Sequence, residues 1–200
     1  MKENYDKLLK KIIEELEYKP NLLLHSCCAP CSSYVISFLH NYFNITILYY
    51  NPNIYPKEEY EKRKEEQINL IKNFNNVNFM DCDYDNETYN RLVKGLENEP
   101  EKGRRCDICF KLRLEKTAVL AKNNNFDFFG TTLTVSPYKN STLINDIGSS
   151  LGNEYGIKWL YSDFKKDNGY KKSIELSKEY NLYRQNYCGC IHSKRKEQEN

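Results

Sequence analysis

Eight cysteines are the residues of this 200-residue sequence whose type and spacing point most directly to chemistry. Seven of them fall into three groups, which are Cys27-Cys28-x-x-Cys31, Cys106-x-x-Cys109 and Cys188-Gly189-Cys190. Thiolates bind iron and zinc, and they also carry out thiol–disulfide exchange. Buried inert thiols rarely gather in this way, so the groups indicate a metal or redox function. The eighth cysteine, Cys82, stands alone, which is typical of a plain core or surface thiol.

The cellular compartment decides whether such cysteines form disulfides or bind metal. The N-terminal stretch alternates charged and apolar residues and lacks the apolar core of a signal peptide. No run approaches the roughly 18 apolar residues that a membrane-spanning helix needs. We therefore expect a cytoplasmic protein with no membrane partner. A net charge of +2 argues against a purely electrostatic DNA binder, although a local basic face remains compatible with it.

The spacing of the cysteines does not decide which metal they bind. Two cysteines from each of the first two groups would complete either a 4Fe–4S cluster or a tetrahedral zinc site. The tight Cys188–Cys190 pair can form a strained disulfide or bind a second metal. Helix starts favour thiolates through the helix dipole, and both Cys28 and Cys106 lie at expected helix starts.

The elements that must position these groups alternate between strand and helix. This pattern predicts an α/β fold with a mostly parallel sheet in one Rossmann-like domain, residues 1–193, followed by a charged tail, 194–200. The first cysteine group follows the first strand, at the edge where open parallel sheets bind ligands. The expected strands are 21–24, 45–50, 77–80, 127–132 and 158–161, and the main expected helices are 8–16, 57–74, 89–96, 106–122, 142–151 and 173–180.

Basic and aromatic residues surround the second cysteine pair. Such residues beside a reactive site suit a phosphate backbone and an unstacked base, so they are candidates for RNA contact. A chain rich in lysine and tyrosine also gathers such residues by chance, and both interpretations stay open here. The candidates are Arg104, Arg105, Lys111, Arg113 and Tyr138, with Lys139, Tyr183 and Arg184 as further members.

Several long motifs, taken in order, resemble the cobalamin-independent epoxyqueuosine reductases, the QueH family. The resemblance spans about residues 20–193. The motifs are HSCCAPCS at 25–32, RCDICFKLR at 105–113, TTLTVSPYK at 131–139, GYKKSIELS at 169–177 and YRQNYCGC at 183–190.

This resemblance implies an activity, a fold and a set of roles. Members reduce the epoxide of epoxyqueuosine, in the anticodon loop of tRNA, to the alkene of queuosine, without cobalamin. The implied fold is that of the nucleotide-alpha-hydrolase-like proteins, with the cysteine loop where they bind phosphate; no Ser-Gly-Gly-x-Asp-Ser stretch is present, which argues against ATP use. The implied ligands of a 4Fe–4S cluster are Cys27, Cys28, Cys106 and Cys109.

The resemblance also implies that Cys188 and Cys190 form a redox-active pair, with Cys31 serving an additional iron ion as an open alternative. The expected catalytic residues are then Cys188, Cys190, Cys31 and Asp107. A proton donor is needed as well, for which Asp107, a thiol and water are the candidates. The electron donor is not identified by the sequence.

Three rival interpretations remain. A zinc-stabilised RNA-binding module would use the same cysteines without catalysis. A thioredoxin-like oxidoreductase would use Cys28-x-x-Cys31 at a strand-to-helix turn, although it would not need the other two groups. A tRNA thiolation enzyme of the same broad fold would need the ATP-binding loop that this chain lacks.

Overall fold

The structure is a computed structural model that describes residues 3–194. Its centre is a sheet of five strands in the order β3-β2-β1-β4-β5, and every neighbouring pair is parallel. The chain adds strands outward on one side of β1 and then returns to its other side with β4. The strands are β1 (Asn21–His25), β2 (Asn44–Leu48), β3 (Val77–Met80), β4 (Phe128–Thr131) and β5 (Lys158–Trp159).

The central strand is apolar because both of its faces are covered. Leu22 and Leu24 pack into one core together with Ile45, whereas Leu23 points the other way and packs with Phe129. All three leucines of β1 are fully buried. A continuous apolar run of this kind is typical of a parallel strand between two helical layers.

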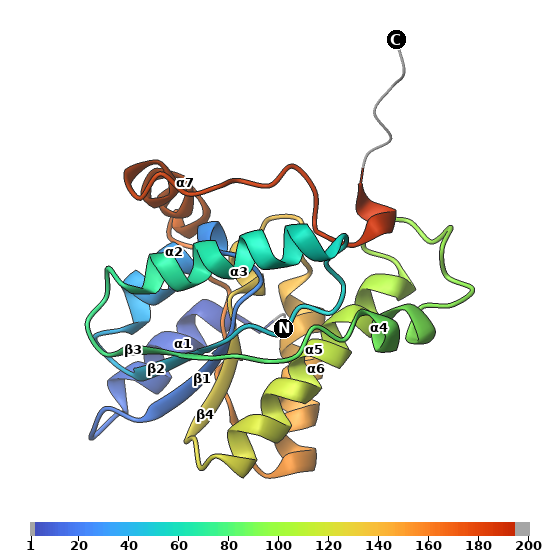
Figure 1. Ribbon diagram of the computed structural model, residues 1–200. Coiled ribbons are helices and arrows are strands. Elements are labelled where there is room, and N and C mark those ends of the chain that lie inside the picture. Colours follow the sequence, from blue (N-terminus) through green and yellow to red (C-terminus); the bar gives the residue numbers. More distant parts are fainter. Residues whose placement is uncertain (1–2, 195–200) are drawn as a thin grey trace.

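The two layers consist of different helices (Figure 1). Apolar side chains of α1, α2, α3 and α7 fill the core on one face, and those of α5 and α6 fill the core on the other. The helices are α1 (Tyr5–Glu14), α2 (Ala29–Leu39), α3 (Lys57–Ile71), α4 (Asn86–Leu92), α5 (Arg104–Asn123), α6 (Ser141–Tyr155) and α7 (Gly169–Glu179), with short 3-10 helices η1 (Leu133–Val135) and η2 (Ile191–Ser193).

Local sequence signals explain where the site-bearing helices begin. Pro30 stands in the first turn of α2, where its missing N–H costs nothing. Gly103 precedes α5, which therefore starts at Arg104 and carries Cys106 and Cys109 in its first two turns. Asn140 caps α6 by accepting a hydrogen bond from the N–H of Leu143, 3.2 Å away. The cysteines thus lie at helix starts, as the sequence predicted.

The predicted α/β fold and parallel sheet are confirmed, and the strand positions agree to within a few residues. The 3-10 helix η1 was not predicted, because a three-residue turn carries no periodic signal. Most of the expected charged tail, 194–200, lies outside the described residues. Within the part of the chain that is described, no helix is long and apolar enough to span a membrane.

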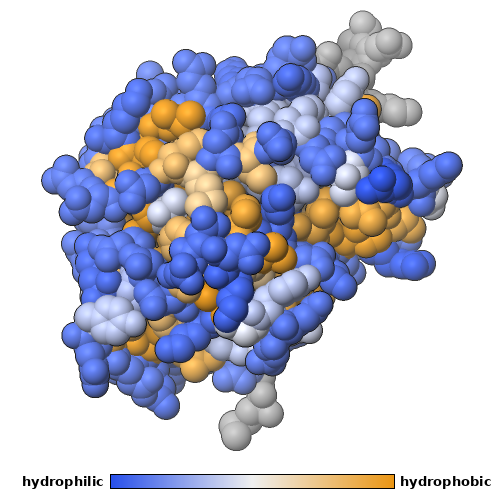
Figure 2. All heavy atoms as spheres, turned by 60° about the horizontal axis from the view of Figure 1, so that its bottom comes forward, coloured by the Kyte–Doolittle hydropathy of each residue, from blue (hydrophilic) through white to orange (hydrophobic). Residues whose placement is uncertain are grey.

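The surface is mixed in character. Figure 2 shows a face on which apolar patches are separated by polar and charged side chains. Tyr18 and Tyr138 are among the large apolar side chains that are mainly exposed, at 67% and 61%. The order of the strands reverses between β1 and β4, and in open α/β sheets this position, at the carboxyl ends of the strands, is where ligands bind.

Candidate functional site

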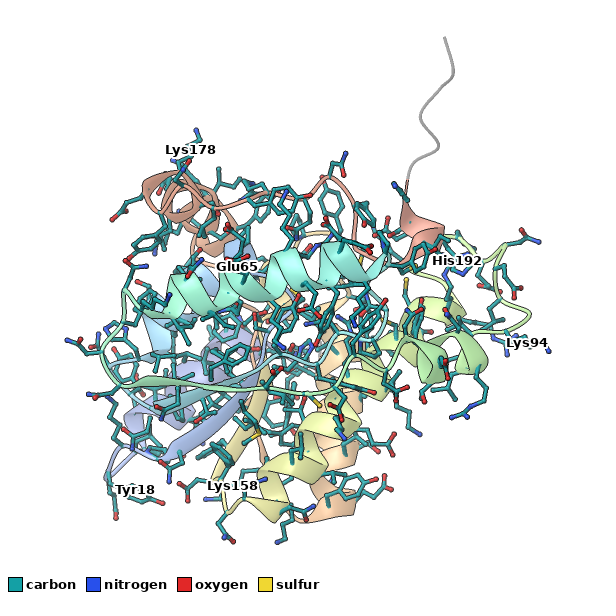
Figure 3. The ribbon with its side chains drawn as sticks, in the orientation of Figure 1. Tyr18, Glu65, Lys94, Lys158, Lys178 and His192 are labelled. Carbon is teal, nitrogen blue, oxygen red and sulfur yellow. The ribbon has the colours of Figure 1, made fainter. Side chains whose placement is uncertain are left out.

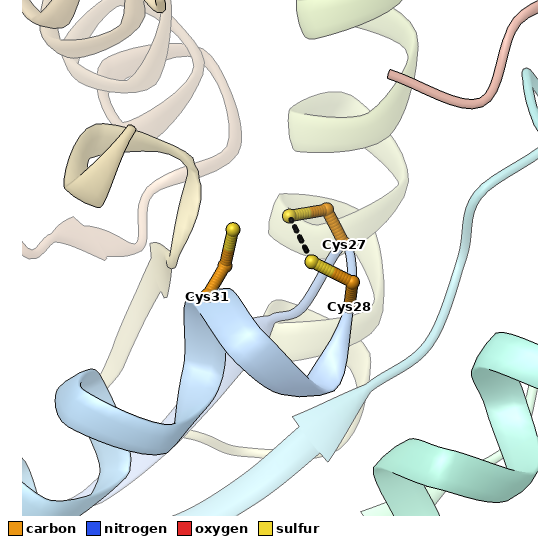
Figure 4. Close-up of side chains that lie close together, drawn as sticks. All are labelled: Cys27, Cys28 and Cys31. Carbon is orange, nitrogen blue, oxygen red and sulfur yellow. Dashed lines mark hydrogen bonds between the residues drawn. The ribbon is translucent and has the colours of Figure 1, made fainter. Parts of the chain in front are cut away.

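The turn between β1 and α2 holds the first cysteine group. The strand ends at His25 and the helix begins at Ala29, so Cys27 and Cys28 occupy the turn and Cys31 follows in the helix. The three Sγ atoms lie within 4.8 Å of one another, and those of Cys27 and Cys28 are 3.8 Å apart (Figure 4). Three converging soft donors form a group that could hold a metal ion.

The pKa values of the three thiols are shifted in different directions. Hydrogen bonds from Cys27 and Cys31, with a smaller one from Gln185, hold the pKa of Cys28 well below its ordinary value. Hydrogen bonds with Cys27 and Cys28 raise the pKa of Cys31 well above its ordinary value, and the contact with Cys28 raises that of Cys27. Cys28 is therefore the thiol of this group that most readily becomes the anionic ligand.

His25 fixes the end of the strand that leads into the turn. Its Nδ1 lies 2.9 Å from Thr131 Oγ1, and its Nε2 lies 3.2 Å from the carbonyl oxygen of Tyr50. Burial, together with the charge of Arg113, lowers the pKa of His25 to about 3. The imidazole is thus neutral and ties three neighbouring strand ends together.

The second and third cysteine groups meet in one narrow cavity of about 20 Å³. Cys106 and Cys109 reach it from α5, and Cys188 and Cys190 reach it from the C-terminal segment. All eight cysteines lie in the described residues, and each is a free thiol. The cavity has room for little more than one water-sized probe, so a nucleobase cannot enter it in this conformation.

Buried positive charge surrounds this four-thiol cavity. Arg113 is 2% exposed, and its guanidinium interacts electrostatically with Cys109, Cys188 and Cys27, which belong to all three groups. Its Nη2 atom has no hydrogen-bond partner among the described residues. The ammonium of Lys139 donates a hydrogen bond to Cys188 Sγ at 3.0 Å. Charge of this sign is suited to a site that carries several thiolates.

The C-terminal segment is held in place by α3 and by the loop that precedes it. After α7 the chain runs alongside α3 towards η2 (Figure 1). Arg63 donates hydrogen bonds to the carbonyl oxygens of Cys188 and Tyr187, at 3.1 and 3.4 Å. The N–H of Tyr55 donates to the carbonyl oxygen of Gly189 at 2.9 Å. Gln185, in the same segment, donates a hydrogen bond to Cys28 Sγ at 2.9 Å.

A wider depression of about 120 Å³ adjoins the four-thiol cavity and shares Cys106 and Lys139 with it. Asp107 and Asn140 line this depression, and the exposed ring of Tyr138 stands at its side. This depression therefore offers an aromatic ring, a carboxylate and an amide for contact with a flat ligand.

The candidates for RNA contact divide into exposed and buried residues. Arg104, Lys111 and Tyr138 are exposed on this side of the protein. Arg105 and Arg113 are buried, and Arg105 donates hydrogen bonds from Nη1 to the carbonyl oxygens of Leu96, Glu97 and Glu99. In this conformation those two guanidinium groups face the protein interior and support the α4–α5 loop and the cavity.

Cys82 lies apart from the other seven thiols. It lines a separate depression that follows β2 and β3, together with Tyr84 and Lys116. Burial raises its pKa. Figure 3 marks His192 on η2, next to the region of the α4–α5 loop that carries Lys94.

Sequence analysis did not single out Arg63 or Gln185 as parts of the site. Arg63 stands in a highly charged helix, α3, yet its side chain is 2% exposed. Gln185 lies in a segment without regular structure. The only sequence signal for either residue was membership of Gln185 in the YRQNYCGC motif.

A doubly wound parallel sheet with seven thiols near its carboxyl edge defines a Rossmann-like protein equipped for metal or thiol redox chemistry. The family described as "Epoxyqueuosine reductase QueH" matches residues 22–196. The chain belongs to this family.

Relatives named epoxyqueuosine reductase QueH align over nearly the whole chain. The protein of Staphylococcus epidermidis is 46% identical over 94% of this chain and 83% of its own. That of Streptococcus pyogenes is 44% identical over 95% and 78%, respectively. That of Staphylococcus aureus is 43% identical over 94% and 82%.

Proposed function

We propose that this protein reduces epoxyqueuosine to queuosine in the anticodon loop of tRNA, using a 4Fe–4S cluster and a redox-active cysteine pair. The observation that carries the proposal is the buried guanidinium of Arg113, which interacts electrostatically with one thiol from each of the three cysteine groups. Membership of the QueH family and the names of the relatives support the substrate. The reaction consumes two electrons and two protons and releases water.

The donor set fits an iron–sulfur cluster. Cys27, Cys28, Cys106 and Cys109 would hold it, because thiolates are the usual ligands of such clusters. Four thiolates around a cubane leave net negative charge, and the unpartnered Nη2 of Arg113 supplies a buried donor for it within the described residues. When bound, the cluster would pass electrons singly to the substrate.

The remaining thiols have different tasks in this proposal. Cys188 and Cys190 line the same cavity as two of the proposed cluster ligands, so electrons held by the dithiol have a short path. Cys31 completes the first thiol group and would serve an additional iron ion or hold a proton on Sγ.

Asp107 would deliver a proton from its carboxyl group to the epoxide oxygen as the C–O bond breaks. Its position beside Cys106, in the wider depression, supports this role. The exposed ring of Tyr138 would stack on the unstacked base, and Arg104 and Lys111 would contact phosphates of the loop. The electron donor is still to be identified.

The test is anaerobic reconstitution with iron and sulfide, followed by conversion of epoxyqueuosine-containing tRNA. Cys106→Ala should lose both the iron–sulfide absorbance and the activity. Cys188→Ala should keep the absorbance and lose turnover. Cys82→Ala is the matched control and should keep both, because Cys82 lies in a different depression.

Three outcomes would contradict the proposal. Loss of the cluster in Cys188→Ala would show that the division of roles is wrong. Stoichiometric zinc without iron–sulfide absorbance would favour a zinc-stabilised RNA-binding module. Full activity on a disulfide substrate without iron would favour a thioredoxin-like oxidoreductase.

A further inference from the structure

Lys139 stands where the four-thiol cavity meets the wider depression. Its side chain lines both hollows, whereas each of the other cations that line them lines only one, within the part of the chain that the structure describes. The depression has room for several water molecules, and the four-thiol cavity for little more than one. A small oxygen-bearing group in the depression can therefore meet the ammonium of Lys139 while the four-thiol cavity stays closed.

The surrounding residues fix the position of this ammonium. The side chain of Lys139 is 9% exposed, and its Nζ lies 3.6 Å from Glu101 Oε1. Nζ also donates a hydrogen bond to Cys188 Sγ at 3.0 Å and lies 5.8 Å from the centre of the Phe110 ring. At the backbone, the N–H of Lys139 donates to the carbonyl oxygen of Ser136 at 3.2 Å. The cation is therefore held in one place between the two hollows.

The ammonium has capacity for one more acceptor. A lysine ammonium has three N–H donors. Within the described residues, one donor bonds to Cys188 Sγ, and Glu101 takes at most one more, across a gap longer than an ordinary N–H···O hydrogen bond. That carboxylate is 48% exposed, so it balances the buried charge without enclosing it. An oxygen of a bound ligand can take the third donor.

Breaking a C–O bond of an epoxide places negative charge on the oxygen. A cation stabilises such charge far more strongly where water is excluded than at an exposed surface. Lys102, the other cation that lines the depression, is exposed and lies 5.9 Å from the centre of the Tyr138 ring. Asp107, the proton donor proposed above, lines the same depression as Lys139. An oxygen held there would thus have a buried cation and a carboxyl group beside it.

We propose that Lys139 is a catalytic residue that binds the epoxide oxygen of the substrate and stabilises the negative charge on it as the C–O bond breaks. This inference rests on the reaction proposed above. Its support is the place of Lys139 between the two hollows, the burial of its side chain and its unused donor.

The reaction balances without a change in Lys139. Both C–O bonds of the epoxide break, a C=C bond forms, and the oxygen leaves as water. The dithiol of Cys188 and Cys190 supplies the two electrons and two protons and becomes a disulfide, which the electron donor later reduces. Asp107 passes one of these protons to the oxygen, and Lys139 keeps its own protons throughout.

Binding of the oxygen can be measured apart from its removal. Iron-loaded protein is prepared with the Cys188–Cys190 pair oxidised and without an electron donor, so that no conversion occurs. Its affinity is then compared for two anticodon stem-loops, one carrying epoxyqueuosine and the other queuosine, which lacks the oxygen. A residue that only supported the fold would change both affinities by the same factor.

We expect the unmodified protein to bind the epoxyqueuosine stem-loop about tenfold more tightly, the ordinary effect of one hydrogen bond to a charged group. Lys139→Met should bind the two stem-loops about equally, and Lys139→Arg should keep part of the preference. Lys102→Met is the matched control and should keep the full preference, because Lys102 lines the same depression but is exposed. Equal affinities in the unmodified protein, or a preference that survives in Lys139→Met, would overturn the inference.

Single-turnover conversion by the reduced, iron-loaded protein tests the stabilisation of charge. Lys139→Met should be slower by about 100-fold or more, the usual cost of losing a group that stabilises an oxyanion. Lys165→Met should keep the unmodified rate, because Lys165 pairs with Asp163 and lines neither hollow. An unmodified rate in Lys139→Met would overturn the catalytic role.

The two proposals fail in different ways. If the unmodified protein leaves epoxyqueuosine intact, the proposed function fails. If it converts the substrate but binds both stem-loops equally, only the role of Lys139 fails.

Discussion

At the scale of single residues, one amide joins the end of the described chain to the first thiol group. Gln185 Nε2 donates to Cys28 Sγ at 2.9 Å, and Cys28 is the thiol whose pKa is lowered. Groups that hydrogen-bond to metal ligands orient them, and their loss typically costs 10–100-fold in metal affinity. In the proposed cluster site, Gln185 would therefore orient the ligand Cys28.

Replacing Gln185 by Ala should weaken iron retention by about tenfold or more. The measurement is competition with a chelator during anaerobic incubation. Asn186→Ala is the matched control, because Asn186 is the exposed neighbour in the same segment. Equal iron loss in both variants would mean that the contact with Cys28 has no role in metal binding.

The neutral His25 makes stability depend on pH. The folded protein keeps His25 neutral down to about pH 3, whereas the ordinary pKa of histidine is 6.5, so the unfolded chain binds its proton first. The contribution is intact above pH 6.5 and is lost as the pH falls towards 3, with a slope of at most about 1.4 kcal/mol per pH unit.

His25→Gln should flatten this dependence. Urea unfolding of the metal-free protein at about pH 5 and 7.5 measures the difference, and His40→Gln serves as control, since His40 bonds only to carbonyl oxygens of its own helix. If His25→Gln loses as much stability between the two pH values as the unmodified protein does, His25 is not the group that titrates.

At the scale of elements, the docking of the C-terminal segment depends on a glycine. Gly189 has φ +121°, and a Cβ placed on it would lie 2.9 Å from Ile54 Cγ1 and 3.1 Å from Arg63 Nη1. A side chain at this position would be strained by the positive φ and would also clash with Ile54 and Arg63. The loop that carries Cys188 and Cys190 can approach α3 so closely only because residue 189 has no side chain.

Gly189→Ala should lower the free energy of unfolding by about 1–3 kcal/mol more than Gly95→Ala. Gly95 also has a positive φ, +84°, but a Cβ added there would have nothing within 4 Å, so this glycine isolates the backbone cost. Chemical denaturation measures both. Equal losses in the two variants would mean that crowding against Ile54 and Arg63 costs nothing.

The sequence predicted elements better than contacts between them. The apolar run of β1 and the expected helix 106–122 carry local signals, so they agree with β1 and, to within two residues, with the bounds of α5. The burial of Arg63 carries no such signal, because α3 is charged along most of its length and only its partners at 187 and 188 explain the burial. Long-range pairing of this kind cannot be derived from one segment.

At the scale of the whole molecule, the sequence predicted the existence of the three cysteine groups better than their arrangement in space. Spacing indicated three cysteine groups and placed the first of them where β1 ends at the carboxyl edge of the sheet, which agrees with the structure. One cavity is shared by the second and third cysteine groups, Cys106, Cys109, Cys188 and Cys190. This sharing depends on the path of the C-terminal segment alongside α3, and no local sequence pattern predicts that path. The assignment of Cys27, Cys28, Cys106 and Cys109 as cluster ligands stays a prediction.

The overall charge of +2 means that RNA affinity must come from local positive charge. The double variant Arg104→Ala, Lys111→Ala should bind the anticodon stem-loop more weakly and should reduce the slope of log affinity against log salt by about 1.4, at roughly 0.7 for each of two lost phosphate contacts. Filter binding at several salt concentrations measures the slope.

The control is Lys166→Ala, Lys178→Ala, which removes the same charge from exposed positions at and before α7. Figure 3 marks Lys178 on α7, away from the α4–α5 region. Equal slopes for the two double variants would mean that Arg104 and Lys111 make no phosphate contacts.

The path of the segment after α7 has a consequence for how the protein is made. Cys188 and Cys190 are the last of the eight cysteines to leave the ribosome. Gln185 can donate its hydrogen bond to Cys28 only after this segment has packed alongside α3. During synthesis, the first two cysteine groups are therefore present before the C-terminal segment that packs beside them. In the proposed iron–sulfur protein, metal would reach Cys28 most freely before Gln185 packs against it.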